Sequence, residues 1–128
     1  MSLTVSPDLL AKAQQGPVSD EEFIACVRDS LPYAWSVVTD LAQRLAAGDG
    51  TFADNQQEPP DETARGQLLR MVGSDAMRAA VERHFNVRLA FQNCHRLALF
   101  DLGAGAEYDE FVSPRSQLLN QSPELVNC

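Results

Sequence analysis

Signals that start and stop helices occur at short intervals along this chain. Ser6 and Pro7 place a capping hydroxyl before a proline at the first helical position, and a Gly-Pro pair follows, which predicts a helix over 7–15. The run from Ser19 to Glu22 is a capping box, in which each side chain can bond the backbone N–H of the other residue. A second helix therefore begins directly after this serine.

Apolar residues at spacings of three and four predict further helices between residues 31 and 85. Trp35 lies in the apolar stripe of the first of these, and we expect it to anchor the core near the centre of the molecule. Residues 48–60 hold two glycines and two prolines without periodicity, which predicts a long loop. The expected helices span 31–47, about 61–72, and 75–85.

The segment 87–102 fits two structures. As a helix, its apolar residues share one stripe; as two strands, Val87, Leu89 and Phe91 occupy alternate positions before a turn, and Leu97 and Leu99 do so after it. Val87 is its only β-branched residue, and arginine, leucine, alanine and glutamine dominate, so propensity favours the helix. We therefore expect a helix here, with a short β-hairpin near 87–100 as the alternative.

These signals together predict an all-α fold, an orthogonal bundle of five or six short helices. A chain of 128 residues with 45% hydrophobic residues can bury one core, so we expect a single domain over 1–128 with a partly extended C-terminal tail over 113–128. Its apolar runs are far shorter than the ~20 residues of a membrane span. The start of the chain also lacks the pattern of a signal peptide. We therefore expect a cytoplasmic protein with no membrane partner.

The three cysteines, Cys26, Cys94 and Cys128, are an odd number at wide spacings. Such spacing fits neither a disulfide framework nor a CxxC metal or redox pair, and a reducing compartment is the default expectation. Cys26 falls within a helical apolar pattern, so we expect it to be a buried, small hydrophobic residue.

Charge is distributed unevenly along the sequence. The formal net charge is −8, yet residues 65–100 carry six arginines against two acids, a net charge of +4. The flanking segments 1–64 and 101–128 are both acidic. This basic middle segment is either neutralised within the molecule or forms a surface for a partner.

We expect the second arrangement, with arginines of the middle segment on one shared outer face. Arginine offers a planar fork for paired hydrogen bonds to carboxylates and is common among interface hot spots. The function that follows is a non-enzymatic regulatory or adaptor domain that binds a protein partner or a second copy of itself. The residues predicted to carry this recognition are Arg70, Arg78, Arg83 and Arg88.

Two other functions are weaker alternatives. Helix 75–85 and the residues after it resemble a degenerate helix-turn-helix, but nucleic acid is disfavoured because the whole chain is acidic. A small enzyme would use Cys94 and His95, where Arg96 could stabilise a thiolate. The chain has no P-loop, GxGxxG, GxSxG or HExxH motif. We therefore assign no catalytic residue, metal site or cofactor.

Overall fold

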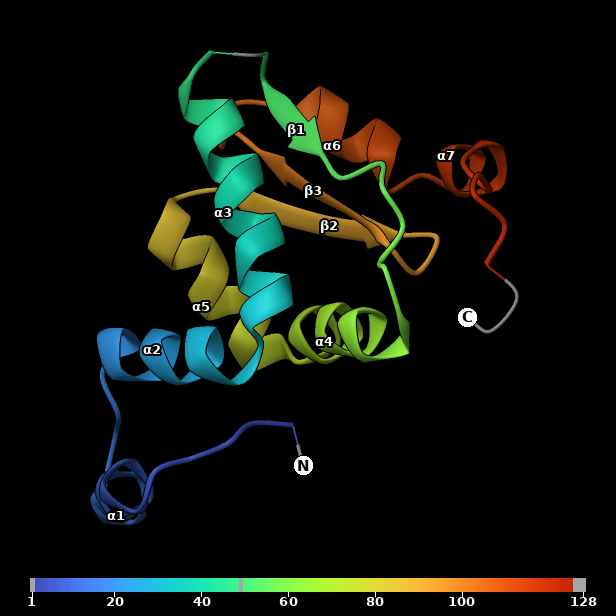
Figure 1. The fold of residues 1–128 in the computed structure, drawn as a ribbon. Coiled ribbons are helices and arrows are strands. Elements are labelled where there is room, and N and C mark those ends of the chain that lie inside the picture. Colours follow the sequence, from blue (N-terminus) through green and yellow to red (C-terminus); the bar gives the residue numbers. More distant parts are fainter. Residues whose placement is uncertain (1, 49, 126–128) are drawn as a thin grey trace.

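The structure is a computed structural model that describes residues 2–48 and 50–125 (Figure 1). No helix within these two ranges has the length and hydropathy that a membrane crossing requires. Cys128 lies outside the described residues. In chain order the elements are α1 (Pro7–Gln15), α2 (Asp20–Ser30), α3 (Pro32–Ala46), β1 (Phe52–Asp54), α4 (Glu62–Gly73), α5 (Asp75–Phe85), β2 (Arg88–Gln92), β3 (Arg96–Phe100), α6 (Gly105–Phe111) and α7 (Pro114–Leu119).

The predicted all-α bundle is wrong, because three strands form an antiparallel sheet in the order β1-β3-β2. The segment 87–100, for which the sequence predicts a helix, instead contains the hairpin of β2 and β3. Asn93 and Cys94 at its tip have φ values of 53° and 56°, in the left-handed region that a right-handed helix cannot include. The fold is therefore mixed α/β.

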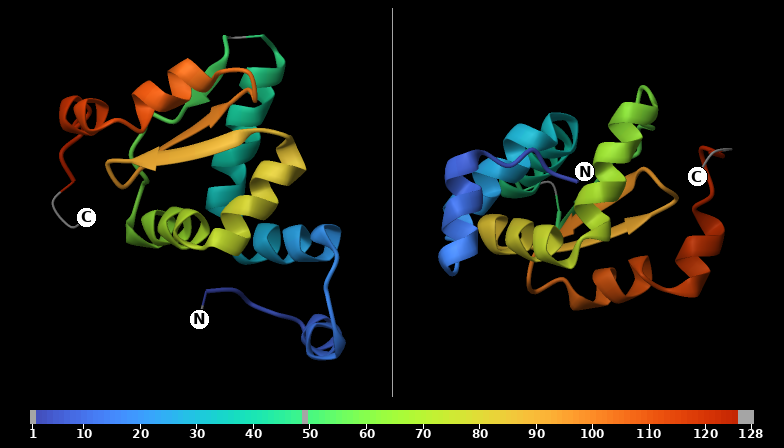
Figure 2. Two further views of the ribbon diagram at one scale, coloured as in Figure 1. Left: turned by 180° about the vertical axis from the view of Figure 1, so that it is seen from behind. Right: turned by 90° about the horizontal axis from the view of Figure 1, so that it is seen from below.

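The sheet is a middle layer with helices on both faces, which explains why its strands are hard to recognise (Figure 2). When both faces are buried, the alternation of apolar and polar residues that marks a strand disappears. One face joins the larger core formed with α3, α4 and α5, through Ala53, Leu89, Leu97 and Leu99. The other face packs against α6, through Ala90, Ala98 and Phe100.

Most helix boundaries follow the local signals. The predictions for α1, for the start of α2 and for the helix over 75–85 are confirmed. At the capping box, the Glu22 N–H donates to the Ser19 hydroxyl at 3.2 Å. The Glu22 carboxylate accepts the hydroxyl of Ser19 at 3.0 Å, rather than its backbone N–H.

Three local expectations differ from the structure. Strand β1 lies inside the predicted loop 48–60, where it pairs with β3. Helix α6 begins at Gly105, in a stretch for which the sequence signals predict no helix. Trp35 is half-buried at the margin of the larger core rather than at its centre, and its ring lies 5.5 Å from His84 and 5.4 Å from Phe85, centroid to centroid.

Helix α1 stands apart from the rest of the molecule (Figure 1). None of its residues is buried. An ion pair between Lys12 and Glu22 connects it to α2, and the hydrogen bond to Glu22 raises the pKa of Lys12. The sheet and the helices packed on it therefore carry the core, and α1 is an outlying element.

Candidate functional site

The edge of the sheet formed by β2 borders a groove of about 700 Å³. Helix α5 contributes Arg78 and Glu82 to its lining, and α6 contributes Tyr108. The strand itself contributes Arg88–Phe91. We call this site the β2-edge groove, and it places an open strand edge between two helices.

The backbone groups that β2 directs into the groove belong to Leu89 and Phe91. The Leu89 N–H donates to the Glu82 carboxylate at 2.9 Å, so it points away from β3. Residues of an antiparallel pair face the partner strand and face away in alternation, which puts Phe91 on the same side as Leu89. Within the described ranges, no residue hydrogen-bonds to the outward N–H or C=O of Phe91.

Two arginines of the predicted set, Arg78 and Arg88, meet at this groove. The Arg88 guanidinium carbon lies 3.6 Å from the centre of the Tyr108 ring, a cation–π contact, and no described acid forms an ion pair with it. Arg78 pairs with Asp75 at 2.9 Å, and the Asp75 side chain is 92% exposed. An ion pair this exposed stabilises little and can exchange for another carboxylate.

The other two predicted arginines, Arg70 and Arg83, lie elsewhere. Arg83 donates through two nitrogens to the Asp20 carboxylate of α2, at 2.8 and 2.9 Å. The hydrogen bond from Arg83 lowers the pKa of Asp20 below its usual value. Arg70 on α4 is exposed, does not line the groove, and forms no ion pair with another described residue. Of the four predicted arginines, the groove therefore brings together Arg78 and Arg88, whereas Arg70 and Arg83 are not in its lining.

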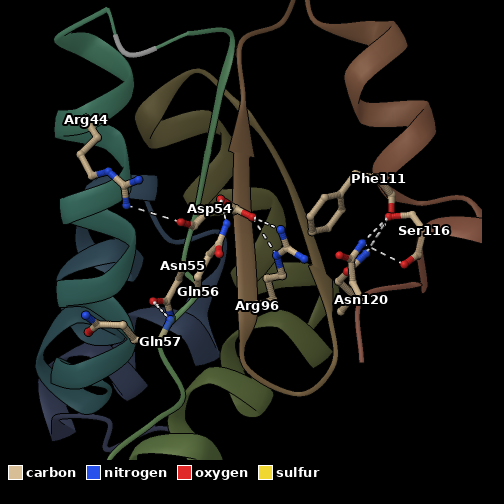
Figure 3. A network of polar contacts seen from close by, with 10 residues as sticks. Arg44, Asp54, Asn55, Gln56, Gln57, Arg96, Phe111, Ser116 and Asn120 are labelled. Carbon is tan, nitrogen blue, oxygen red and sulfur yellow. Dashed lines mark hydrogen bonds and ion pairs between the residues drawn. The ribbon is translucent and has the colours of Figure 1, made fainter. Parts of the chain in front are cut away.

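At the opposite edge of the sheet, Arg96 and Arg44 form a cluster around Asp54 of β1. Arg96 of β3 binds the Asp54 carboxylate of β1 at 2.7 Å, and both side chains are mostly buried. Figure 3 shows the Arg96 side chain between Asp54 and the ring of Phe111. Arg44 of α3 donates to the Asp54 carbonyl. The Arg96 guanidinium is held by the internal carboxylate of Asp54, so its role is structural.

Beside this cluster, a cavity of about 490 Å³ lies between the sheet and helices α6 and α7. Arginines and glutamates are balanced in its lining, through Arg96, Glu107, Glu110 and Arg115. Arg115 already pairs with Glu110 at 2.8 Å. The formal charges of its charged lining residues therefore cancel.

The predicted alternative site at Cys94 and His95 lacks the features of a catalytic pair. Cys94 is disulfide-bonded, so its sulfur is not a thiolate, and the prediction of unpaired cysteines is wrong at this position. His95 is fully buried, and its Nδ1 lies 2.9 Å from the Asn93 carbonyl oxygen. Both residues belong to the tip of the hairpin, where Asn93 and Cys94 form the turn. The disulfide also removes part of the basis for predicting a reducing compartment.

The helix-turn-helix interpretation is also wrong. The residues after α5 form β2, so the described chain has no helix at the position of a recognition helix. Asn86 ends α5 in the left-handed conformation, with φ 56° and ψ 51°. This residue therefore turns the chain into a strand.

The whole chain, residues 1–128, matches the model of one protein family, described as NucS shadow ORF. The chain belongs to the NucS shadow ORF family. The label of the family also includes KH, which suggests a KH-like mixed α/β fold and agrees with a small antiparallel sheet packed by helices. Neither a curated protein nor a solved structure matches the chain.

This member of the NucS shadow ORF family lacks the sequence by which KH modules hold nucleic acid. KH modules clamp four backbone nucleotides with a GXXG loop. The chain has seven glycines, and no two of them have the spacing of that motif. The N-terminus of α5 could receive a phosphate, but Ser74 already caps it and Asp75 adds a negative charge to its first turn.

Sequence reasoning missed three residues of the β2-edge groove: Glu82, Phe91 and Tyr108. Glu82 and Phe91 matter because of the strand edge, which is invisible while 87–100 is interpreted as a helix. Tyr108 lies on α6, in a region for which the sequence predicts no helix. The alternation of Leu89 and Phe91 was the one signal that could have revealed this site.

Proposed function

We propose that this protein is a non-enzymatic regulatory or adaptor domain that binds an acidic segment of a protein partner in the β2-edge groove. Arg78 and Arg88 are the residues that would recognise the carboxylates. The observation that carries the proposal is the state of Arg88, whose guanidinium stacks on Tyr108 without a described acidic partner. Of the nine arginines, Arg70 and Arg88 are the two that form no ion pair with a described acid, and Arg88 is the one of these two that lines the β2-edge groove.

The charges of the groove favour an anionic partner. Arg78, Arg88 and Glu82 are its charged lining residues, and their formal charges leave one positive charge in excess. The Glu82 carboxylate is engaged by the Leu89 N–H. Guanidinium groups bind carboxylates through two parallel hydrogen bonds. The ring of Tyr108 supports the guanidinium of Arg88 in such a position.

A protein segment fits this groove better than nucleic acid does. Two arginines neutralise few phosphates, and the remaining acidic surface repels a polyanion. An acidic peptide needs only local charge complementarity, which gives specificity and association rate more than affinity. The acidic segment can come from another protein or from a second copy of this chain, which itself contains 18 acidic residues.

The test is charge reversal at the groove. We expect Arg88→Glu and Arg78→Glu each to weaken binding of a fluorescent acidic peptide by about tenfold or more, because each replaces an attractive contact with a repulsive one. Arg28→Glu is the matched control, since Arg28 is an exposed arginine of α2 outside the groove. Fluorescence anisotropy measures the affinities, and light scattering of the unliganded protein reports self-association.

Three outcomes have distinct meanings. Loss of binding in the two groove variants but not in the Arg28 variant supports the proposal. Equal affinity in all three variants overturns it. A concentration-dependent dimer that Arg88→Glu dissociates identifies the second copy as the source of the acidic segment.

A further inference from the structure

We infer that the acidic segment binds in an extended conformation and adds to the sheet as a fourth strand, antiparallel to β2. This inference rests on the proposed function and specifies the conformation of the bound segment. Its basis is the edge of β2, which is five residues long and borders the groove with Leu89, Ala90 and Phe91. Strand addition uses such an edge, with backbone hydrogen bonds for affinity and side-chain contacts for specificity.

The hydrogen bonds that the edge offers define where the added strand pairs. The Glu82 carboxylate occupies the Leu89 N–H, so this donor is already used. The N–H and C=O of Phe91 point to the same side and have no partner among the described residues. In an antiparallel ladder, one residue of the added strand exchanges both hydrogen bonds with the residue opposite. Phe91 is therefore the residue at which pairing is centred.

The two arginines lie toward opposite faces of the sheet, which predicts the pattern of acidic residues in the segment. Arg78 is on α5, which packs on the face that contains Leu89. Arg88 contacts Tyr108 of α6, which packs on the other face. Adjacent residues of a strand point to opposite faces. Two neighbouring acidic residues in the segment can then reach one arginine each.

The walls of the groove favour a single extended chain over the sheet edge of another folded copy. Helices α5 and α6 both line the groove and so border the edge on both faces of the sheet. The sheet of a second copy would have to enter together with its own flanking helices. An isolated segment carries no such helices and can lie between these walls.

Two peptides test the spacing. The first is an eight-residue peptide of threonine and valine with one adjacent aspartate–glutamate pair, and the second has the same composition with these acids two positions apart. We expect the first to bind about tenfold more tightly, because the second directs both acids to one face. A third peptide, with prolines at alternating positions around the adjacent pair, removes ladder donors and is expected to bind at least as weakly as the second.

Hydrogen exchange of single amides, followed by NMR, tests the ladder itself. We expect saturation with the first peptide to slow exchange of the Phe91 amide by about tenfold or more, because the ladder protects it. The Leu89 amide, bonded to Glu82 before binding, serves as the internal reference. Binding with unchanged Phe91 exchange and equal affinity for all three peptides overturns strand addition while leaving the proposed function intact. Absence of binding by every peptide overturns both.

Discussion

The two edges of the sheet, β1 and β2, are protected in different ways. Strand β1 has three residues, and the Asp54 carboxylate and carbonyl are bound by Arg96 and Arg44. Strand β2 has five residues and borders an open groove, where Glu82 covers only the Leu89 N–H. Short or partly covered edges are less suited to pairing with another chain than a longer open edge is. The difference makes β2 the longer and more open of the two edges, which is why the proposed binding site uses it.

Arginines show the same contrast. At β1, the Arg96–Asp54 pair is mostly buried, with side-chain exposures of 18% and 11%. At β2, Arg88 rests on an aromatic ring and Arg78 has only an exposed acid as its partner. The same residue type therefore stabilises one edge and remains available at the other.

Breaking the β1 edge should have the largest effect on stability. Asp54→Ala leaves the Arg96 guanidinium mostly buried and without its carboxylate, at a cost of about 1.5–3 kcal/mol. Urea unfolding followed by circular dichroism measures this cost. Glu110→Ala is the control, because it breaks the exposed pair with Arg115 and should cost less than about 1 kcal/mol. Equal losses in the two variants would contradict the structural role given to the β1 edge.

Substitution of Glu82 tests the β2 edge, where its carboxylate accepts the Leu89 N–H. Glu82→Ala frees the Leu89 N–H and removes one negative charge from the groove, so we expect unfolding free energy to fall by about 1 kcal/mol. The same variant should bind an acidic peptide about threefold to tenfold more tightly. Glu82→Gln keeps an acceptor oxygen for Leu89, and it should lose less stability than the alanine variant while still binding more tightly. Weaker peptide binding in both variants would show that Glu82 assists the site.

The smallest effect is expected at Arg83, which lies away from the groove. The folded-state pKa of Asp20 is lowered by its hydrogen bond to Arg83, so the stabilisation is present above the ordinary pKa of 3.8 and disappears as pH falls through the lower folded value. Arg83→Gln should therefore reduce the melting temperature slightly at pH 6 and leave it unchanged near pH 2. Its peptide affinity should equal that of the unmodified protein. If the difference in melting temperature between Arg83→Gln and the unmodified protein grew toward low pH, it would contradict this pH dependence.

Much of the helical structure could be predicted because its signals are local. Ser6 and Ser19 cap α1 and α2 as their sequence contexts indicate, and Asn86 ends α5. Helix α6 escaped prediction because no side chain caps it and it begins at Gly105. The hairpin escaped because both of its faces are buried, so its apolar residues do not alternate cleanly.

The candidate site was only partly predictable, for a related reason. Counting charges directs attention to the arginines of the middle segment, but it cannot say which of them are paired. Arg83 binds Asp20, 63 residues away in sequence, and this contact exists only once α2 packs against α5. The stacking of Arg88 on Tyr108 likewise depends on α6. Contacts between residues distant in sequence therefore decide which arginines are free to bind a partner. Local sequence patterns do not predict these contacts.

A charge swap at Arg78 and Arg88 tests whether these two residues recognise the acidic segment. The double variant Arg78→Glu and Arg88→Glu should lose affinity for the peptide with the adjacent aspartate–glutamate pair and gain affinity for the same peptide with two lysines in their place. Anisotropy titrations of both peptides against both proteins give the four affinities, and circular dichroism confirms that the double variant is folded. We expect the unmodified protein to prefer the acidic peptide and the double variant to prefer the lysine peptide. A folded double variant that still prefers the acidic peptide would show that the β2-edge groove does not recognise it.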